Sequence, residues 1–136
     1  MNNFFVFDTN VLISAMFDCN SSSAKSLIQA RNQGWLLISK EIGTEYLSVF
    51  SRKKFDKWVP LENRINFIEN IIESSMCVDV VTKQVFACRD SKDNMYLSLA
   101  VAAQANCIIS SDKDLLTLHP FNGISILTPV EFLKSS

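Results

Sequence analysis

Short runs of mainly apolar residues recur along the chain, and their alternation with segments of helical periodicity restricts its fold more than any other feature. The runs are rich in aromatic and β-branched residues and occupy residues 4–7, 35–38, 78–81, 107–109 and 124–127, with a single polar residue in each of the runs at 78–81 and 124–127. A run that is apolar at every position, rather than at alternate positions, is typical of a central strand buried on both faces. We therefore expect about five buried strands.

The segments between these runs have apolar residues at helical spacing. The first follows the serines at 21–23, which are favoured capping residues, and ends at Gly34. Further helical segments begin near Glu41, cover residues 65–72, and extend from about Asp93 to Ala105. Alternating strands and helices form right-handed βαβ units, so the predicted fold class is α/β, with three layers (α/β/α) around a central, mostly parallel sheet of about five strands.

The composition is that of one compact globular domain, which we expect to span residues 1–136. With 48% hydrophobic and 20% charged residues, and only three glycines and three prolines, the chain contains no linker-like stretch. Its longest apolar run has five residues, at 99–103, whereas a membrane span needs about 18, so no membrane association is expected. The four cysteines form no C-x-x-C pair and there is one histidine, which disfavours a zinc finger or redox motif and fits a reducing cytoplasm.

Acidic residues follow two of the predicted strands, and in parallel sheets ligand sites gather at the carboxyl ends of strands. Asp8 directly follows the run at 4–7, and Asp112 lies just beyond the run at 107–109, with Asp114 two residues further on. Each position has a structural alternative. Asp is a favoured helix N-cap, which would account for Asp8, and a common turn residue, which would account for Asp112 and Asp114.

Glu45 lies on the apolar stripe of the helix predicted over residues 41–52, three positions after Ile42 and four before Val49. A buried carboxylate without a partner is costly, so Glu45 requires a cation or a place at the rim of a cleft. A structural glutamate exposed at such a rim is the alternative.

Residues 90–94 open the predicted helix that ends near Ala105. Asp93 is four positions before Leu97 and therefore faces inward, whereas Asp90 lies one turn earlier, outside the helix. Either carboxylate could instead cap free N–H groups at the start of the helix, and for Asp90 this alternative is favoured.

Four acids from four separate elements are thus predicted at strand ends or on inward helical faces: Asp8, Glu45, Asp93 and Asp112. Clustered carboxylates stay ionised together only if a cation lies among them. Hard oxygen ligands select Mg²⁺ or Mn²⁺, and the scarcity of histidine disfavours zinc. Such ions activate water and stabilise a departing oxygen, so the predicted reaction class is phosphodiester hydrolysis.

The same acids stand in four short motifs, in this order: residues 6–12 (VFDTNVL), Glu45, residues 90–94 (DSKDN) and residues 109–116 (ISSDKDLL). This ordered set resembles the PIN-domain ribonucleases, and more closely the VapC-like toxin components of bacterial toxin–antitoxin pairs. The stretch at 123–133 is similar to the last strand and helix of that family, so the resemblance covers essentially the whole chain.

The resemblance implies a PIN-like fold and a metal-dependent endoribonuclease in which the four acids hold one or two Mg²⁺ or Mn²⁺ ions. Positions that would support the metal or its ligands are Asn10, Asp90, Ser110 and Asp114. The resemblance alone implies an antitoxin partner and a homodimer. The chain departs from the family at Ser110-Ser111, where relatives commonly have Thr-Gly, and in the third motif, where Asp93 is preferred to Asp90 because it faces inward.

Residues 51–58 combine basic and aromatic side chains just after the helix that carries Glu45. Basic groups contact phosphates and aromatic rings stack on unpaired bases, so this segment is a candidate approach surface for single-stranded RNA. The candidate contacts are Arg52, Lys53, Lys54 and Lys57. The alternative is an ordinary solvated helix end with Phe55 and Trp58 tucked under a loop.

The net charge of −1 at first disfavours a protein that holds nucleic acid by bulk positive charge. However, four of the 14 acids are assigned to the pocket, which leaves ten acids against 13 bases elsewhere. We therefore expect weak binding of RNA that depends on metal.

Two other functions are compatible with parts of the pattern. One is a non-catalytic RNA- or partner-binding module of the same fold. The other is an Asp-dependent phosphatase. The sequence disfavours it, because the motif of such phosphatases has a second Asp two residues after the first, where this chain has Asn10.

Overall fold

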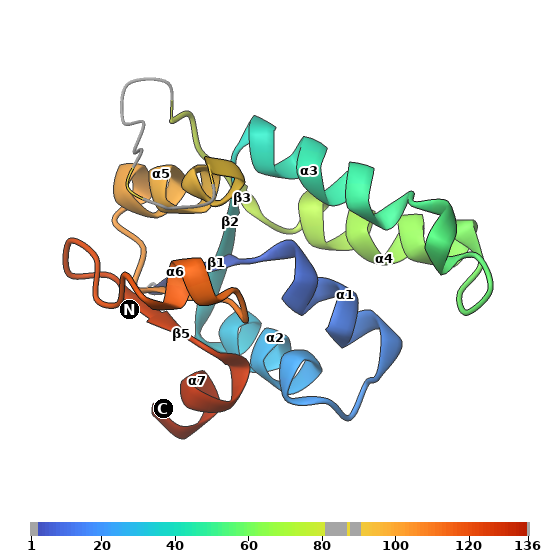
Figure 1. Ribbon diagram of the computed structural model, residues 1–136, viewed down its shortest axis with the longest axis horizontal. Coiled ribbons are helices and arrows are strands. Elements are labelled where there is room, and N and C mark those ends of the chain that lie inside the picture. The colour runs from blue at the N-terminus through green and yellow to red at the C-terminus, as the bar shows by residue number, and fades with distance from the viewer. Residues whose placement is uncertain (1–2, 81–86, 88–90, 136) are drawn as a thin grey trace.

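The computed structural model describes residues 3–80, 87 and 91–135, which form a five-stranded sheet in the order β3-β2-β1-β4-β5 (Figure 1). The strands are β1 (Asn3–Phe7), β2 (Gly34–Ile38), β3 (Met76–Cys77), β4 (Cys107–Ile109) and β5 (Ser125–Leu127). Each pair of neighbouring strands is parallel. The predicted α/β class with a central parallel sheet is confirmed.

Helices cover both faces of the sheet, with α5 on one side and α2 and α7 on the other (Figure 1). The α-helices are α1 (Thr9–Phe17), α2 (Ser22–Gln33), α3 (Lys40–Phe50), α4 (Leu61–Glu73), α5 (Asn94–Ala103), α6 (Lys113–Leu116) and α7 (Pro129–Ser135). Two 3₁₀ turns, η1 (Lys53–Phe55) and η2 (Ser91–Asp93), precede α4 and α5. The α3 and α4 helices pack against each other as a hairpin, and η1 lies in the connection between them.

The central strand β1 is fully buried over its last three residues because β2 and β4 flank it and helices cover both faces. Its backbone pairing with β4 continues past the strand, since the Asp8 N–H donates to the Ile109 carbonyl at 3.0 Å. In the same way, the Ser110 N–H donates to the Leu127 carbonyl at 2.9 Å. The residues that follow β1 and β4 are therefore held side by side at the carboxyl edge of the sheet.

The helix limits follow local capping. The Ser21 side chain accepts from the Ala24 N–H at 3.1 Å and begins α2, and Gly34 ends it, as the sequence predicted. Ser39 caps α3 in the same way, through the Ile42 N–H at 3.2 Å.

The predicted strand at 78–81 is wrong in its position. The third strand instead lies at Met76–Cys77, where these residues pair with Leu37 and Ile38, and residue 81 is outside the described residues. The Val78 N–H still donates to the Ile38 carbonyl at 2.8 Å, but β2 ends there because Ser39 turns into α3. Residues 78–80 therefore lie beyond the end of the partner strand.

Among residues 3–80, 87 and 91–135, we find no helix with the length and apolar character that a bilayer crossing requires.

Gly34 is required by the close approach of β1 and β2, and Gly34→Ala should be destabilising. A Cβ at this position would overlap the backbone of Asn3, its partner in the register. We expect the free energy of unfolding to fall by about 1–3 kcal/mol, measured by urea denaturation. Gly43→Ala is the matched control, because its Cβ meets nothing within 4 Å and alanine favours the α3 helix. Equal effects of the two substitutions would contradict the steric explanation.

Candidate metal and catalytic site

A cavity of about 190 Å³ opens at the carboxyl edge of the sheet, where β1, α3 and α5 meet. It is lined by Asp8, Thr9, Asn10, Glu45, Val49, Arg52, Lys92, Asp93, Tyr96 and Asp112. The four acids that the sequence placed in one pocket therefore line one cavity, although they come from segments up to about a hundred residues apart.

Asp8 is both a helix cap and a wall of the cavity. Its Oδ1 accepts from the Asn10 N–H at 2.9 Å and so begins α1, while its Oδ2 accepts from the Ser110 hydroxyl at 2.6 Å. The side chain is buried, and this burial raises the pKa of Asp8 above its ordinary value. The hydrogen bonds from Ser110 and Asn10 oppose the shift, and the nearby charges of Asp112 and Glu45 add to it.

Ser110 joins the two strand ends through a chain of hydrogen bonds. The Asp112 N–H donates to the Ser110 Oγ at 2.9 Å, and the Ser110 hydroxyl donates to Asp8. Asp112 also caps α6, since its Oδ1 accepts from the Asp114 N–H at 2.8 Å. The capping and turn alternatives for Asp8 and Asp112 are thus confirmed as local interactions, and they coexist with a place in the cavity.

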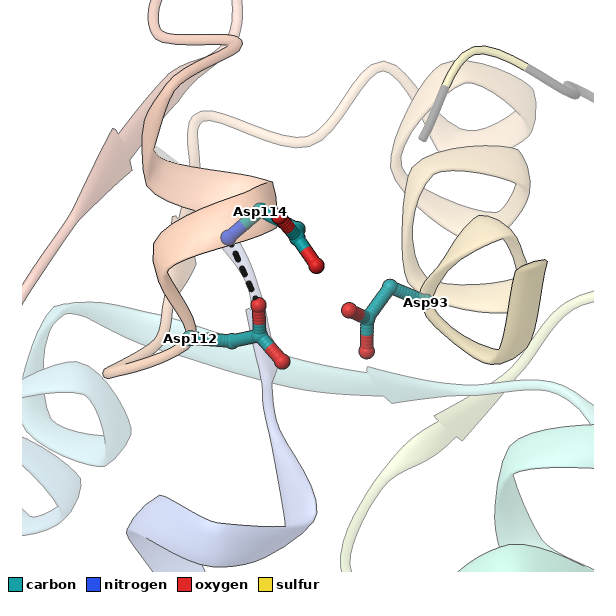
Figure 2. A group of neighbouring side chains, drawn as sticks. All are labelled: Asp93, Asp112 and Asp114. Atoms are coloured by element: carbon teal, nitrogen blue, oxygen red, sulfur yellow. Dashed lines mark hydrogen bonds between the residues drawn. The ribbon is translucent and has the colours of Figure 1, made fainter. Parts of the chain in front are cut away.

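At the carboxyl edge of the sheet, three carboxylates point toward one another: those of Asp93, Asp112 and Asp114 (Figure 2). One oxygen of each lies within 4.8 Å of the others. Asp93 ends η2 and is buried, whereas Asp112 and Asp114 stand at the start of α6 and are half-buried. Within the described part of the chain, Asp8 and Glu45 are not members of this tight group, although they line the same cavity.

The donor set fits a hard divalent cation. Two oxygen ligands of one Mg²⁺ ion lie about 3.0 Å apart when they are adjacent and about 4.2 Å apart when they are opposite, given octahedral geometry and a usual metal–oxygen distance of about 2.1 Å. The three carboxylate oxygens, which lie within 4.8 Å of one another, are therefore grouped near this spacing. The sequence predicted Asp114 as a supporting residue, and the structure groups one of its carboxylate oxygens with those of Asp93 and Asp112 within 4.8 Å.

Glu45 projects from α3 into the cavity and is half-buried. Its charge contributes to the raised pKa values of both Asp8 and Tyr96, after the larger effect of burial. The carboxylate therefore faces the other acids from across the cavity, as its place on the apolar stripe of the helix predicted.

Two buried tyrosines that no sequence motif marked lie near the site: Tyr96 lines the cavity, and Tyr46 bonds to the last residue of β1. The Tyr96 hydroxyl is hydrogen-bonded to the Thr9 side chain at 2.6 Å, and the Tyr46 hydroxyl donates to the Phe7 carbonyl at 2.5 Å. Burial is the main cause of the raised pKa of both tyrosines, so they act as neutral hydrogen-bonding groups. The sequence contained one indication that Tyr96 lies at the site: it is about one helical turn after Asp93 and therefore on the same inward face of the helix.

The predicted basic contacts divide into two groups. Arg52 lines the cavity, and so does Lys92, which the sequence analysis did not propose. Lys53, Lys54 and Lys57 are exposed on the connection between α3 and α4, outside the cavity lining. Their contact with RNA stays a prediction. Asp90 lies outside the described residues.

The fold and this cavity define an α/β protein with a carboxylate-lined site at the carboxyl edge of a parallel sheet. The pattern of the PIN domain family matches residues 5–114 of the chain. An uncharacterized protein of Methanocaldococcus jannaschii is 32% identical over 142 residues, which cover 95% of this chain and 88% of that protein. The chain therefore belongs to the PIN domain family. PIN domains are generally nucleases, and they typically use divalent metals.

Solved structures share the fold at lower sequence identity. A chain of VapBC2 from Rickettsia felis, in a complex with a DNA fragment from its promoter, has a TM-score of 0.64 at 14% identity, covering 90% of this chain and 96% of that one. A protein from Pyrobaculum aerophilum has a TM-score of 0.63 at 13% identity, covering 97% and 88%. A chain of DNA-bound VapBC from Salmonella typhimurium has a TM-score of 0.61 at 16% identity, covering 95% and 99%.

The raised pKa of Asp8 predicts how Asp8→Asn changes the stability of the metal-free protein. A pKa that is higher in the folded state favours folding at low pH, and this contribution is lost as the pH rises through the folded-state pKa. In EDTA at about pH 7, Asp8→Asn should therefore unfold at the same temperature as the unsubstituted protein or higher, and any gain should vanish below about pH 4.

Differential scanning fluorimetry across this pH range measures the effect. Glu69→Gln, at an exposed position of α4, is the control and should leave the pH dependence unchanged. A lower unfolding temperature for Asp8→Asn at about pH 7 would show that ionised Asp8 stabilises the fold, contrary to this prediction.

Proposed function

We propose that the protein is a metal-dependent endoribonuclease, a hydrolase that cuts RNA phosphodiesters. The observation that carries the proposal is the convergence of Asp93, Asp112 and Asp114 within 4.8 Å, at a cavity that Asp93 and Asp112 line together with Asp8 and Glu45. Ionised carboxylates at this spacing repel one another strongly, and a cation removes that repulsion. The chain belongs to a family of nucleases, which supports a phosphodiester as the bond that is cut.

Asp93, Asp112 and Asp114 would hold the first Mg²⁺ or Mn²⁺ ion, and Asp8 and Glu45 would complete its surroundings or hold a second ion. When bound, such an ion polarises a phosphoryl oxygen and favours water as the nucleophile. The Ser110 hydroxyl orients Asp8, and the Asp112 N–H orients Ser110, so these groups set the geometry of the carboxylates.

The remaining residues of the cavity have separate roles in this proposal. Arg52 and Lys92 supply positive charge to the phosphate at the cavity wall. In this proposal the Glu45 carboxylate is the general base that accepts a proton from the attacking water. Asp8 is less suited to this role, because its Oδ1 already accepts a hydrogen bond from Asn10 and its Oδ2 accepts one from Ser110.

The proposal extends to a biological role. Chains of VapBC complexes from Rickettsia felis and Salmonella typhimurium share the fold, which supports a toxin component that is held by an antitoxin protein. On the same ground we propose a cytoplasmic protein that forms a homodimer.

A non-catalytic binding module of the same fold is the alternative function. It retains the acids for metal-linked stability but cuts nothing. An Asp-dependent phosphatase is less favoured, because Asn10 stands where that pattern has its second Asp, and the phosphatase pattern does not account for Glu45 in the cavity.

Incubation with end-labelled single-stranded RNA separates the three functions. We expect internal cuts that require Mn²⁺ and are abolished by EDTA. Asp8→Asn, Asp93→Asn and Asp112→Asn should each lower the cutting rate more than the roughly 100-fold that loss of an outer-shell partner costs. Glu69→Gln on α4 is the control. Undiminished cutting by purified Asp8→Asn would contradict the assignment. Phosphate release from a monoester would indicate the phosphatase, and metal binding without either product would indicate the binding module.

The position of Asp114 predicts that it binds the metal directly. Asp114→Asn should weaken Mn²⁺ binding at least about tenfold, as measured by isothermal titration calorimetry without RNA. Asp18→Asn, an exposed acid at the end of α1, should bind Mn²⁺ like the unsubstituted protein. Unchanged affinity in Asp114→Asn would contradict this role and leave Asp114 as an acidic residue in the first turn of α6 only.

A further inference from the structure

Three aromatic rings meet where the end of α1 touches the connection between α3 and α4. The centroid of the Phe17 ring lies 5.6 Å from that of Phe55 and 6.2 Å from that of Trp58, which it meets edge to face. Phe55 is buried, as the alternative interpretation of this segment predicted, but Trp58 is 63% exposed and Phe17 is 41% exposed. The rings of Phe17 and Trp58 are thus exposed to solvent and pack against the buried ring of Phe55 or against each other.

Lysines lie over two of these three rings, the exposed Trp58 and the buried Phe55. The Lys57 Nζ lies 4.9 Å from the Trp58 centroid, and the Lys54 Nζ lies 5.2 Å from the Phe55 centroid. Arg52 and Lys53 are exposed in the same segment. The one acid of the segment, Asp56, is paired with Arg64 at 2.6 Å, so its charge is compensated. The surface formed by Phe17, Trp58 and these lysines, which we call the aromatic–basic surface, is therefore positively charged.

Arg64 holds this segment in place from below. Its side chain is fully buried, donates to the Arg52 carbonyl at 3.5 Å as well as to Asp56, and lies 6.0 Å from the Phe55 ring. These contacts join the segment to α4, which carries Arg64. The backbone that carries Trp58 is consequently held in place before any ligand arrives, which lowers the entropic cost of binding.

The aromatic–basic surface adjoins the carboxylate cavity. Arg52 connects them, since it lines the cavity and directly precedes Lys53 in the chain. Helix α1 also connects them, because Thr9 lines the cavity and Phe17 ends the helix about 12 Å away at 1.5 Å per residue. This distance corresponds to about four nucleotides at the stacked spacing of 3.4 Å per strand.

We propose that the aromatic–basic surface binds single-stranded RNA a few nucleotides from the bond that is cut. Unpaired bases stack on Trp58 and Phe17, and Lys53, Lys54 and Lys57 contact the phosphates. The inference rests on the proposed ribonuclease function, and it identifies the surface outside the cavity that binds the RNA substrate.

The charge of the surface favours a nucleic acid over a protein as its occupant. Lysine is depleted at protein–protein interfaces, whereas this surface combines several lysines with exposed rings. Unpaired nucleotide bases can stack on the aromatic rings, and the phosphates between them can bind the lysine side chains. A duplex hides its base faces in the stack, so an unpaired strand is the form that fits.

Binding is measured without cleavage, in EDTA, with a labelled single-stranded RNA of about ten nucleotides, so that the comparison covers the part of the affinity that the aromatic–basic surface supplies without metal. Trp58→Ala should weaken binding about 5- to 150-fold, which corresponds to the 1–3 kcal/mol of one stacked base. Trp35→Ala is the matched control, because Trp35 is also exposed but lies on β2. Trp58→Phe should restore most of the affinity. In a Trp35→Phe background, Trp58 is the single tryptophan left, and its fluorescence should be quenched by RNA.

The lysines have their own control. Lys57→Ala should reduce the slope of log affinity against log salt by about 0.7, the value for one phosphate contact on a single strand. Lys25→Ala, at an exposed position of α2, should not change the slope. Circular dichroism and the unfolding temperature establish that each variant is folded.

The outcomes separate this inference from the proposed nuclease function. Absence of RNA binding by the unsubstituted protein, or equal affinity of Trp58→Ala and Trp35→Ala, would overturn the inference even if Mn²⁺-dependent cutting is intact. RNA affinity that depends on Trp58, in a protein that cuts nothing with Mn²⁺, would support the aromatic–basic surface and contradict the nuclease. Concentration-dependent self-association that Trp58→Ala abolishes, with RNA affinity unchanged, would assign the surface to a protein contact and overturn the inference.

Discussion

The parallel pairing of β1 with β4 is the interaction on which the rest of the structure depends. It brings Asp8 next to Ser110, although 102 positions separate them in the sequence, and their hydrogen bond is 2.6 Å long. The pairing does not stop at the strands, because the Asp8 N–H still reaches the Ile109 carbonyl. Every acid of the cavity is then placed relative to this junction, either on the segment that follows a strand or on a helix packed over it.

The cavity brings four carboxylates, and therefore like charges, close together. Burial and neighbouring acids raise the pKa of Asp8, while the hydrogen bonds from Ser110 and Asn10 favour its ionised form. A ligand that binds only the folded state stabilises it in proportion to its affinity. For the proposed metal, function and stability are therefore linked, and the large apolar core supplies the stability that the acids reduce.

Periodicity and the strand-end rule predicted the sheet, the main helices and the segments that carry the acids, because burial on both faces leaves a clear apolar pattern. The position of β3 could not be predicted, since pairing ends where Ser39 diverts β2 into α3. The approach of Asp114 to Asp93 depends on the turn that Asp112 caps, which no helical phase encodes. Arg64 was hidden for a similar reason, because a charged residue is expected outside until its partners Asp56 and Phe55 are placed over it.

The connection between α3 and α4 has an evolutionary consequence. Trp58 and Lys57 make no part of the cavity lining, and among the described residues of this segment Arg52 alone reaches it. Substitutions at the tip of the hairpin can therefore accumulate without disturbing the carboxylates or the strand junction that orients them. A lineage with this architecture can diversify what it recognises while its reaction chemistry stays constant, provided that the Arg64 anchor beneath the hairpin is retained.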